Sequence, residues 1–409
     1  MKEHLSQSAQ GSGAALKSEA RNSKSEIHQP KAGKNSNNQN SNDPNKLKTK
    51  MRKMLKKNSR NRTLVIQGTR TMVLLRILGL LIVLIGTWLW ASPSHADDPG
   101  YVVSIQFEND FFGGGTDRHF SHGTRIECLT APIQFITDAA DKLPWFRSER
   151  ARTSPKDELK ARASFSLGQN MYTPEDTVTT QLITEDRPYA GWLYMGFGLV
   201  ANQGTKRYDQ LELEIGMVGP SSFAEDVQTF WHSLLGLQVP KGWDNQLKNE
   251  PAAVLYYEQT RRFERQNIGL GLDVDVLPHF GGALGNVFTY AAAGITLRLG
   301  SELEDDFGPP RIRPSLPGSA YFRPEKGFNW YLFAGLEGRA VLYNVFLDGN
   351  TFTDSHSVDK KPFVGDLQAG LVVQWNRFRI TYTQIFRTKE FDGQDSGDIF
   401  GSLSLSYNF

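Results

Sequence analysis

One fifteen-residue stretch gathers several side chains that could do chemistry. It reads NDFFGGGTDRHFSHG, from Asn109 to Gly123, and holds carboxylates, an amide, hydroxyls and two imidazoles around a run of three glycines. It could form a phosphate loop, a metal loop or only a glycine-rich turn. A phosphate loop is disfavoured, because the GxxxxGK[ST] order and a following helical sequence are absent. An EF-hand is excluded, because the glutamate at its twelfth position is missing.

A serine-hydrolase elbow is also absent, because its G-x-S-x-G order would need a glycine where His119 stands. The plainest alternative is a hairpin tip whose Asn, Asp and Gly residues favour turns. In that case the chemistry belongs to the two ends of the stretch. The candidate residues there are Asn109, Asp110 and Ser121.

A second candidate group lies in the stretch SSFAEDVQTFWHSLLG, which predicts a helix. Ser222 and Glu225 would form a capping box, and Gly236 would end the helix. Gln228 and His232 are four residues apart and therefore share one helical face. Because imidazoles titrate near neutral pH, His232 is a natural general base.

The segments that must position these residues show a hydrophobic pattern with a period of two residues. Apolar and polar residues alternate in 101–110, 210–217, 268–276 and 402–409, as in strands with one polar face. A soluble sandwich alternates as well. Long strands, glycine and carboxylates on the polar faces, and aromatic residues near strand ends favour a transmembrane barrel. Those aromatic residues are Trp192, Tyr194, Trp330, Trp375 and Tyr407.

We therefore predict an all-β fold, a twelve-stranded antiparallel transmembrane β-barrel with a short helix in an extracellular loop. The expected strands lie near 101–110, 119–131, 161–172, 188–201, 207–219, 251–262, 266–277, 286–299, 327–348, 362–375, 377–390 and 397–409. An even number places both chain ends on one side of a membrane. The segments 111–118, 173–187, 220–250, 278–285, 349–361 and 391–396 then lie outside.

This strand count brings both candidate groups to one rim of the barrel. Alternation places Asp110 and Ser121 on the lumen side, and Asn109 on the lipid side unless the strand breaks there. It also turns His119 to the lumen and His122 to the lipid. His119 is therefore the stronger rival to His232 as a base.

The N-terminal quarter of the chain differs in composition from the rest. Residues 1–71 form a basic, polar extension that predicts disorder, and 72–96 resemble a signal peptide cleaved after Ala96, leaving 97–409 as the barrel. A membrane anchor is the alternative, although its apolar run is shorter than the roughly 20 residues that a spanning helix needs. True initiation at Met72 is a further alternative.

Charge and cysteine content narrow the possible partners. Residues 1–96 hold 17 Lys+Arg and 4 Asp+Glu, so 46 less 17 leaves 29 basic residues and 44 less 4 leaves 40 acidic ones. The exported part is thus near −11, which does not suggest a nucleic-acid partner. The single cysteine, Cys128, offers no intrachain disulfide and no CxxC motif.

Several short motifs, in order along the chain, carry a family resemblance. They are ND at 109–110, TDRHFSHG at 116–123, GQNMYTP at 168–174, DRPYAGWLY at 186–194, IGMVGP at 215–220 and EDVQTFWHSLLG at 225–236. Together they resemble the outer-membrane lipid A 3′-O-deacylase (LpxR-like) family. The resemblance implies a bacterial outer-membrane barrel that hydrolyses the 3′-linked acyloxyacyl ester of lipid A with the help of Ca²⁺.

The same resemblance implies roles for individual residues. Its functional residues would be His232 as base, with Asn109, Asp110, Ser121 and Gln228. Asp110, with Asn109, would hold Ca²⁺, and Gln228 could orient the imidazole.

This chain departs from the family at two positions. Ser121 stands where the family has threonine, which keeps the hydroxyl. Gln238 replaces an acidic residue of some members, which would weaken metal binding.

The expected partner is lipopolysaccharide in the outer leaflet, met by a monomeric barrel. An outer-membrane phospholipase and a non-enzymatic barrel or pore are the alternatives.

Overall fold

The computed structural model describes residues 100–409 apart from 113–117, 147–157, 302, 304–305, 313, 315–319 and 324. The predicted extension (1–71) and signal peptide (72–96) lie outside the described residues. The glycine run that follows Asp110 also lies outside them.

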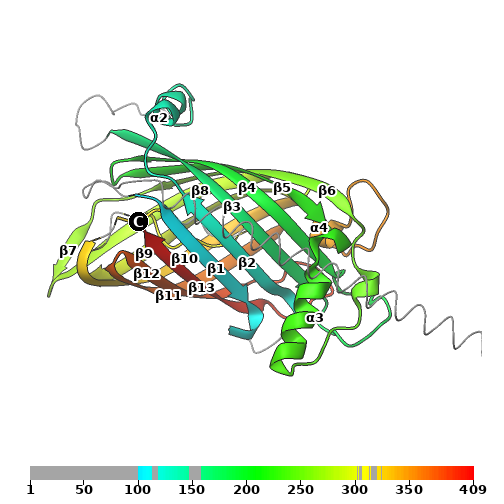
Figure 1. The fold of residues 1–409 in the computed structure, drawn as a ribbon. Coiled ribbons are helices and arrows are strands. Elements are labelled where there is room, and N and C mark those ends of the chain that lie inside the picture. Colours follow the sequence, from blue (N-terminus) through cyan, green and yellow to red (C-terminus); the bar gives the residue numbers. More distant parts are fainter. Residues whose placement is uncertain are drawn as a thin grey trace, which may run out of the picture. The chain divides into compact units, whose positions relative to one another are not determined.

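Twelve long antiparallel strands form a closed barrel (Figure 1). They are β1 (Val102–Asn109), β2 (His119–Leu129), β3 (Leu159–Thr173), β4 (Ala190–Gln203), β5 (Arg207–Val218), β6 (Glu250–Arg261), β8 (Leu272–Gly285), β9 (Phe288–Ser301), β10 (Glu325–Asn344), β11 (Phe363–Asn376), β12 (Phe378–Arg387) and β13 (Asp398–Asn408). The ring closes because β1 pairs with β13 and β6 pairs with β8. The predicted fold is confirmed.

The strand predicted at 266–277 is wrong in position. A short strand, β7 (Gln266–Gly269), turns back onto the start of β8, and the wall strand runs on to Gly285. The turn falls at Gly269, Leu270 and Gly271, whose φ angles are 90°, 57° and 71°. Since alternation continues through this turn, the sequence pattern hides it. The whole of the expected outer loop 278–285 is therefore part of a strand.

Among the described residues, three short helices and three 3-10 turns lie at the two ends of the barrel. The helices are α2 (Gln134–Ala140), α3 (Ala224–Leu235) and α4 (Val345–Asp348), and the turns are η1 (Asp110–Phe112), η3 (Pro220–Ser222) and η4 (Trp243–Asn245). Figure 1 shows α3 and α4 at one end and α2 at the other. No helix in the described part of the chain is long and apolar enough to cross a bilayer.

Polar side chains face the lumen, and apolar ones face outward. On β1, Ser104, Gln106 and Glu108 are buried inside. On β4, Met195 and Phe197 are exposed on the outer wall. An apolar exterior around a polar interior is the pattern of a membrane barrel and the reverse of a soluble core.

Buried ion pairs fill much of the lumen. Arg125 lies 2.8 Å from Glu212 and 2.9 Å from Glu214, and Arg339 lies 3.0 Å from Asp366. Charges in such a site must be paired, because their desolvation is costly.

The connection between β9 and β10 also folds into the lumen. Its Arg311 donates to Glu108 of β1 at 2.7 Å, and its Asp306 accepts from Tyr331 of β10 at 2.9 Å. Further along, the carbonyl of Phe322 accepts from Asn408 of β13 at 3.2 Å. The connection is thus held to strands on different sides of the ring.

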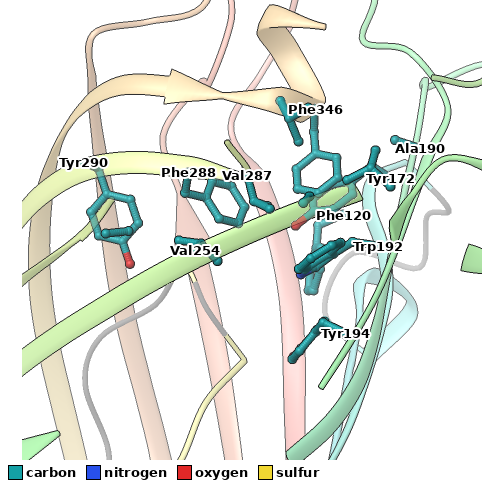
Figure 2. Close-up of a cluster of buried hydrophobic side chains, with 14 of the residues drawn as sticks. Phe120, Tyr172, Ala190, Trp192, Tyr194, Val254, Val287, Phe288, Tyr290 and Phe346 are labelled. Carbon is teal, nitrogen blue, oxygen red and sulfur yellow. The ribbon is translucent and has the colours of Figure 1, made fainter. Parts of the chain in front are cut away.

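An aromatic cluster packs near the outer end of the barrel (Figure 2). Tyr172 of β3 stacks on Phe346 of α4 with 3.9 Å between ring centroids, and Phe120 packs beside Tyr172. Trp192 and Tyr194 of β4 stack on each other. The cluster ties the outer ends of distant strands together, close to the candidate site.

Candidate active site

The first half of the candidate site lies where β1 ends. The strand stops at Asn109, and Asp110 opens the turn η1. On the neighbouring β2, the register with β3 shifts between Phe120 and His122, which leaves Ser121 as a bulged residue. The strict alternation that would place Ser121 in the lumen ends at this bulge.

Short hydrogen bonds hold the three predicted residues of this half together. Asn109 Nδ2 donates to the carbonyl of Ser121 at 2.7 Å. The backbone N–H of Arg118 donates to Asp110 Oδ2 at 2.5 Å. The Ser121 hydroxyl lies 2.5 Å from the hydroxyl of Thr173 on β3. Asn109, Asp110 and Ser121 thus form one group, although twelve residues separate its ends.

Strand register places Asn109 in an outward-facing row of the barrel wall. Asn109, His122, Met171 and Gly191 are successive partners across β1, β2, β3 and β4. Because alternate residues of a strand share a face, this row points outward, on the side that uninterrupted alternation gives for Asn109.

Met171 in this outward row is nevertheless only 1% exposed, because Ala224 of α3 and Trp243 of η4 cover it. The helix therefore packs on the exterior wall at the level of Asn109.

A glycine lets the start of the helix reach the wall. A Cβ at Gly191 would lie 1.9 Å from Ser222 Oγ and 2.4 Å from the Cβ of Ala224. Gln169 of β3 also donates to the carbonyl of Ser222 at 2.5 Å. Both contacts need the close approach that glycine permits.

The predicted capping box is wrong. The Ser222 hydroxyl donates to the carbonyl of Gly219, and the N-cap residue of α3 is Phe223 with a φ of 59°. The predicted end at Gly236 is confirmed, with a φ of 68°. The serine is occupied because the chain turns sharply at Gly219 before the helix begins.

The second half of the candidate site is carried by α3. Gln228 is buried, and its side-chain oxygen accepts from the indole N–H of Trp243 at 2.8 Å. His232 Nδ1 lies 2.6 Å from the carbonyl of Gln238. Because a carbonyl can only accept, Nδ1 carries the proton and Nε2 is the basic nitrogen.

Sequence reasoning missed this use of Gln238. The residue was considered only for its side chain, as a replacement for a metal-binding acid. Its backbone carbonyl orients the imidazole, and a backbone contact leaves no trace in residue type.

The two rival histidines lie in different surroundings. His119 faces the lumen, as predicted, with Nδ1 2.5 Å from Asp398 and Nε2 3.8 Å from Asp186, and it is buried. His122 lies on the outer wall, with Nε2 2.7 Å from the Thr124 hydroxyl. His119 thus joins strand and loop segments at the rim, while His122 stands beside Asn109 in the outward row.

The oxygen donors near Asn109 suit a hard cation only modestly. No group of three or more His, Cys, Asp or Glu side chains among the described residues could hold a metal. Calcium also accepts amide and carbonyl oxygens, however, and its affinity rises with the number of carboxylates. The carboxylate of Asp110 and the amide oxygen of Asn109 therefore fit a weak calcium site.

Comparison with known proteins agrees with this architecture. The family model described as "Outer membrane protein LpxR" matches residues 80–409. The solved structure of LpxR from Salmonella typhimurium is similar with a TM-score of 0.61 at 19% identity, over 75% of this chain and 100% of that one.

Autotransporter barrels are less similar. The Bordetella BrkA β domain has a TM-score of 0.36 at 11% identity, over 76% of this chain and 99% of its own. No curated protein matches the sequence. The family match shows that the chain belongs to the LpxR family, and this family and the barrel fold place the chain in the bacterial outer membrane.

Proposed function

We propose that this protein is a monomeric outer-membrane esterase that removes the 3′-linked acyloxyacyl group from lipid A. One observation carries the proposal: the helix bearing His232 packs on the exterior wall in the same row as Asn109. A general base and a set of polar oxygen and nitrogen groups therefore lie where a lipid in the outer leaflet could reach them.

In the proposed reaction, His232 acts as the general base. Nε2 takes a proton from water while the water oxygen attacks the ester carbonyl carbon. The tetrahedral intermediate then collapses, the bond to the sugar oxygen breaks, and Nε2 returns the proton to that oxygen. The products are a free fatty acid and a sugar hydroxyl. The Gln238 carbonyl keeps the imidazole in the tautomer that this step needs.

The developing negative charge needs donors held in place beforehand. The Asn109 amide and the Ser121 hydroxyl, fixed by their bonds to the bulge and to Thr173, would orient water and substrate or stabilise the oxyanion. Asp110 and Asn109 would hold Ca²⁺, which when bound supplies positive charge next to the ester oxygen. Gln228, held by Trp243, would support the helix that carries the base.

Ester substrates would arrive from the membrane side and not through the lumen. Ion pairs and the β9–β10 connection occupy the lumen among the described residues. This speaks against the pore alternative. A glycerophospholipid has the same ester chemistry, so the choice between lipid A and phospholipid falls to experiment.

Mass spectrometry of lipids from cells that express the protein tests the proposal. Wild type should remove the 3′ acyloxyacyl mass from lipid A, His232→Ala should leave lipid A intact, and Ser233→Ala on the same helix should behave as wild type. Lysophospholipid in place of shortened lipid A would establish the phospholipase alternative. Unchanged lipids with and without added Ca²⁺ would contradict an esterase.

A further inference from the structure

We propose that the C-terminal half of α3 is inserted into the acyl-chain region of the outer leaflet. Its insertion face consists of Phe230, Trp231, Leu234 and Leu235, together with Leu237 directly after the end of the helix. This inference concerns a membrane contact and goes beyond the proposed reaction. The membrane contact does not depend on whether the protein is an active esterase.

The insertion face is exposed although it is apolar. Its five side chains are between 45% and 64% exposed. They continue the helical spacing that begins with Ala224 and Val227, which pack against the barrel. The apolar side of the helix therefore has two different surroundings along its length. Its first turn covers the wall, and its later turns carry the exposed apolar side chains.

The other side of the helix is polar. Glu225, Asp226, Thr229 and Ser233 occupy it, and both acidic residues lie in the first turn. A helix with one apolar and one polar side is suited to lie within the interface of a membrane. In water, so many large exposed apolar groups on twelve residues would be unfavourable.

The apolar outward surface of the barrel near the helix identifies lipid as the occupant. α3 leaves the wall at the row that runs through Asn109, and Gly401 of β13 is the partner of Asn109 in that row. Two residues farther out on β13, Ile399 still faces outward and is 40% exposed. Its partner Phe386 on β12 is 43% exposed. The outward surface of β12 and β13 is thus still apolar beyond the row in which α3 contacts the wall.

The outward surface is also apolar on the other side of this row. Met195 and Phe197 lie on the exterior of β4 four and six residues inward from Gly191, and both are about half exposed. Four residues correspond to roughly 13 Å along a strand. The outward surface of the wall near α3 is thus apolar on both sides of the row that the helix contacts. Figure 1 shows α3 at the outer end of this wall. Acyl chains would contact the helix and the wall together.

A depth measurement tests this placement. Cys128 is the single cysteine, so Cys128→Ser provides a background for one label at a time. We would label Leu234→Cys with bimane and reconstitute the protein in phosphatidylethanolamine and phosphatidylglycerol bilayers. Some of the lipids would carry a nitroxide within the acyl chain. The matched control is Ser233→Cys, the adjacent residue on the polar side.

We expect nitroxide lipids to quench the label at 234 severalfold more strongly than the label at 233, and aqueous iodide to show the opposite order. Equal access of iodide to both labels, without quenching from the acyl chains, would overturn the proposal. Protection at 234 that appears only at high protein-to-lipid ratio would also overturn it, in favour of a second copy as the occupant. Heat-modified migration in gels would verify folding, and Leu235→Cys would replace any variant that fails this check.

Discussion

At the scale of single residues, a hydrogen bond sets the tautomer of the His232 imidazole. Its Nδ1 lies 2.6 Å from the Gln238 carbonyl, which leaves Nε2 as the basic nitrogen. His119, by contrast, is buried between Asp398 and Asp186. These surroundings favour His232 over His119 as the base, in agreement with the family resemblance.

Replacing His232 by alanine should lower the rate of deacylation by about 10²–10⁴-fold, the usual contribution of a general base. Turnover of purified lipid A by protein in detergent micelles measures this effect. His119→Gln should reduce folding yield more than the turnover of the folded fraction. A His232→Ala protein with wild-type turnover would rule the residue out as base.

Asp110 is the one carboxylate of the proposed calcium site, so its charge should set the affinity for the ion. We expect Asp110→Asn to raise the Ca²⁺ concentration for half-maximal activity by about tenfold or more, because affinity depends on the number of charged ligands. Calcium titrations after chelation measure this shift. Asp244→Asn, which removes an exposed carboxylate on η4, should leave the titration unchanged.

At the scale of elements, the contact between α3 and the wall fixes where the helix holds Gln228 and His232 relative to the barrel. The contact depends on small groups: Gly191 on β4 admits Ser222 and Ala224, and Met171 lies beneath the first turn. Apart from the segment around η4, α3 has few other supports. Its position should therefore be sensitive to a single added methyl group.

Gly191→Ala should displace the helix while leaving the barrel folded. The new Cβ would lie 1.9 Å from Ser222 Oγ, and overpacking of this kind costs about 1–3 kcal/mol. Since 1.4 kcal/mol corresponds to a factor of ten, activity should fall by roughly tenfold to a hundredfold. The control is Gly338→Ala, where a Cβ meets nothing within 4 Å. Equal activity of the two variants would contradict a role for close packing.

At the scale of the whole molecule, stability and function are placed in separate regions. The ion pairs and the β9–β10 connection occupy the lumen, whereas the candidate site lies on the outer wall. Asp306 of this connection lies within ion-pair distance of Arg298 and 2.6 Å from Arg379, all three being buried. Removing its charge would leave two guanidinium groups without their shared partner.

Asp306→Asn should therefore lower the free energy of unfolding by about 3–5 kcal/mol, as expected when one partner of a buried ion pair is lost. Urea unfolding in detergent micelles, followed by tryptophan fluorescence, measures the loss. Asp392→Asn breaks the exposed pair with Lys361 and should cost about 0–1 kcal/mol. If both variants unfold at the same urea concentration, the lumen pairs do not stabilise the barrel.

The sequence determined the barrel and the candidate residues, because both are expressed in side-chain type. Alternation with a period of two predicted the number of strands. The motifs identified the candidate site residues, which are Asn109, Asp110, Ser121, Gln228 and His232. The same alternation continued through the Gly269–Gly271 turn and therefore misplaced one strand.

Only the tertiary structure decided how those residues are arranged. The outward row from Asn109 to Gly191 depends on register across four strands. The close packing of α3 on the wall depends on Gly191 having no side chain. The Gln238 carbonyl that orients His232 belongs to the backbone. Pairing register, close approach and backbone hydrogen bonds arise between segments distant in the chain, so local residue patterns do not encode them.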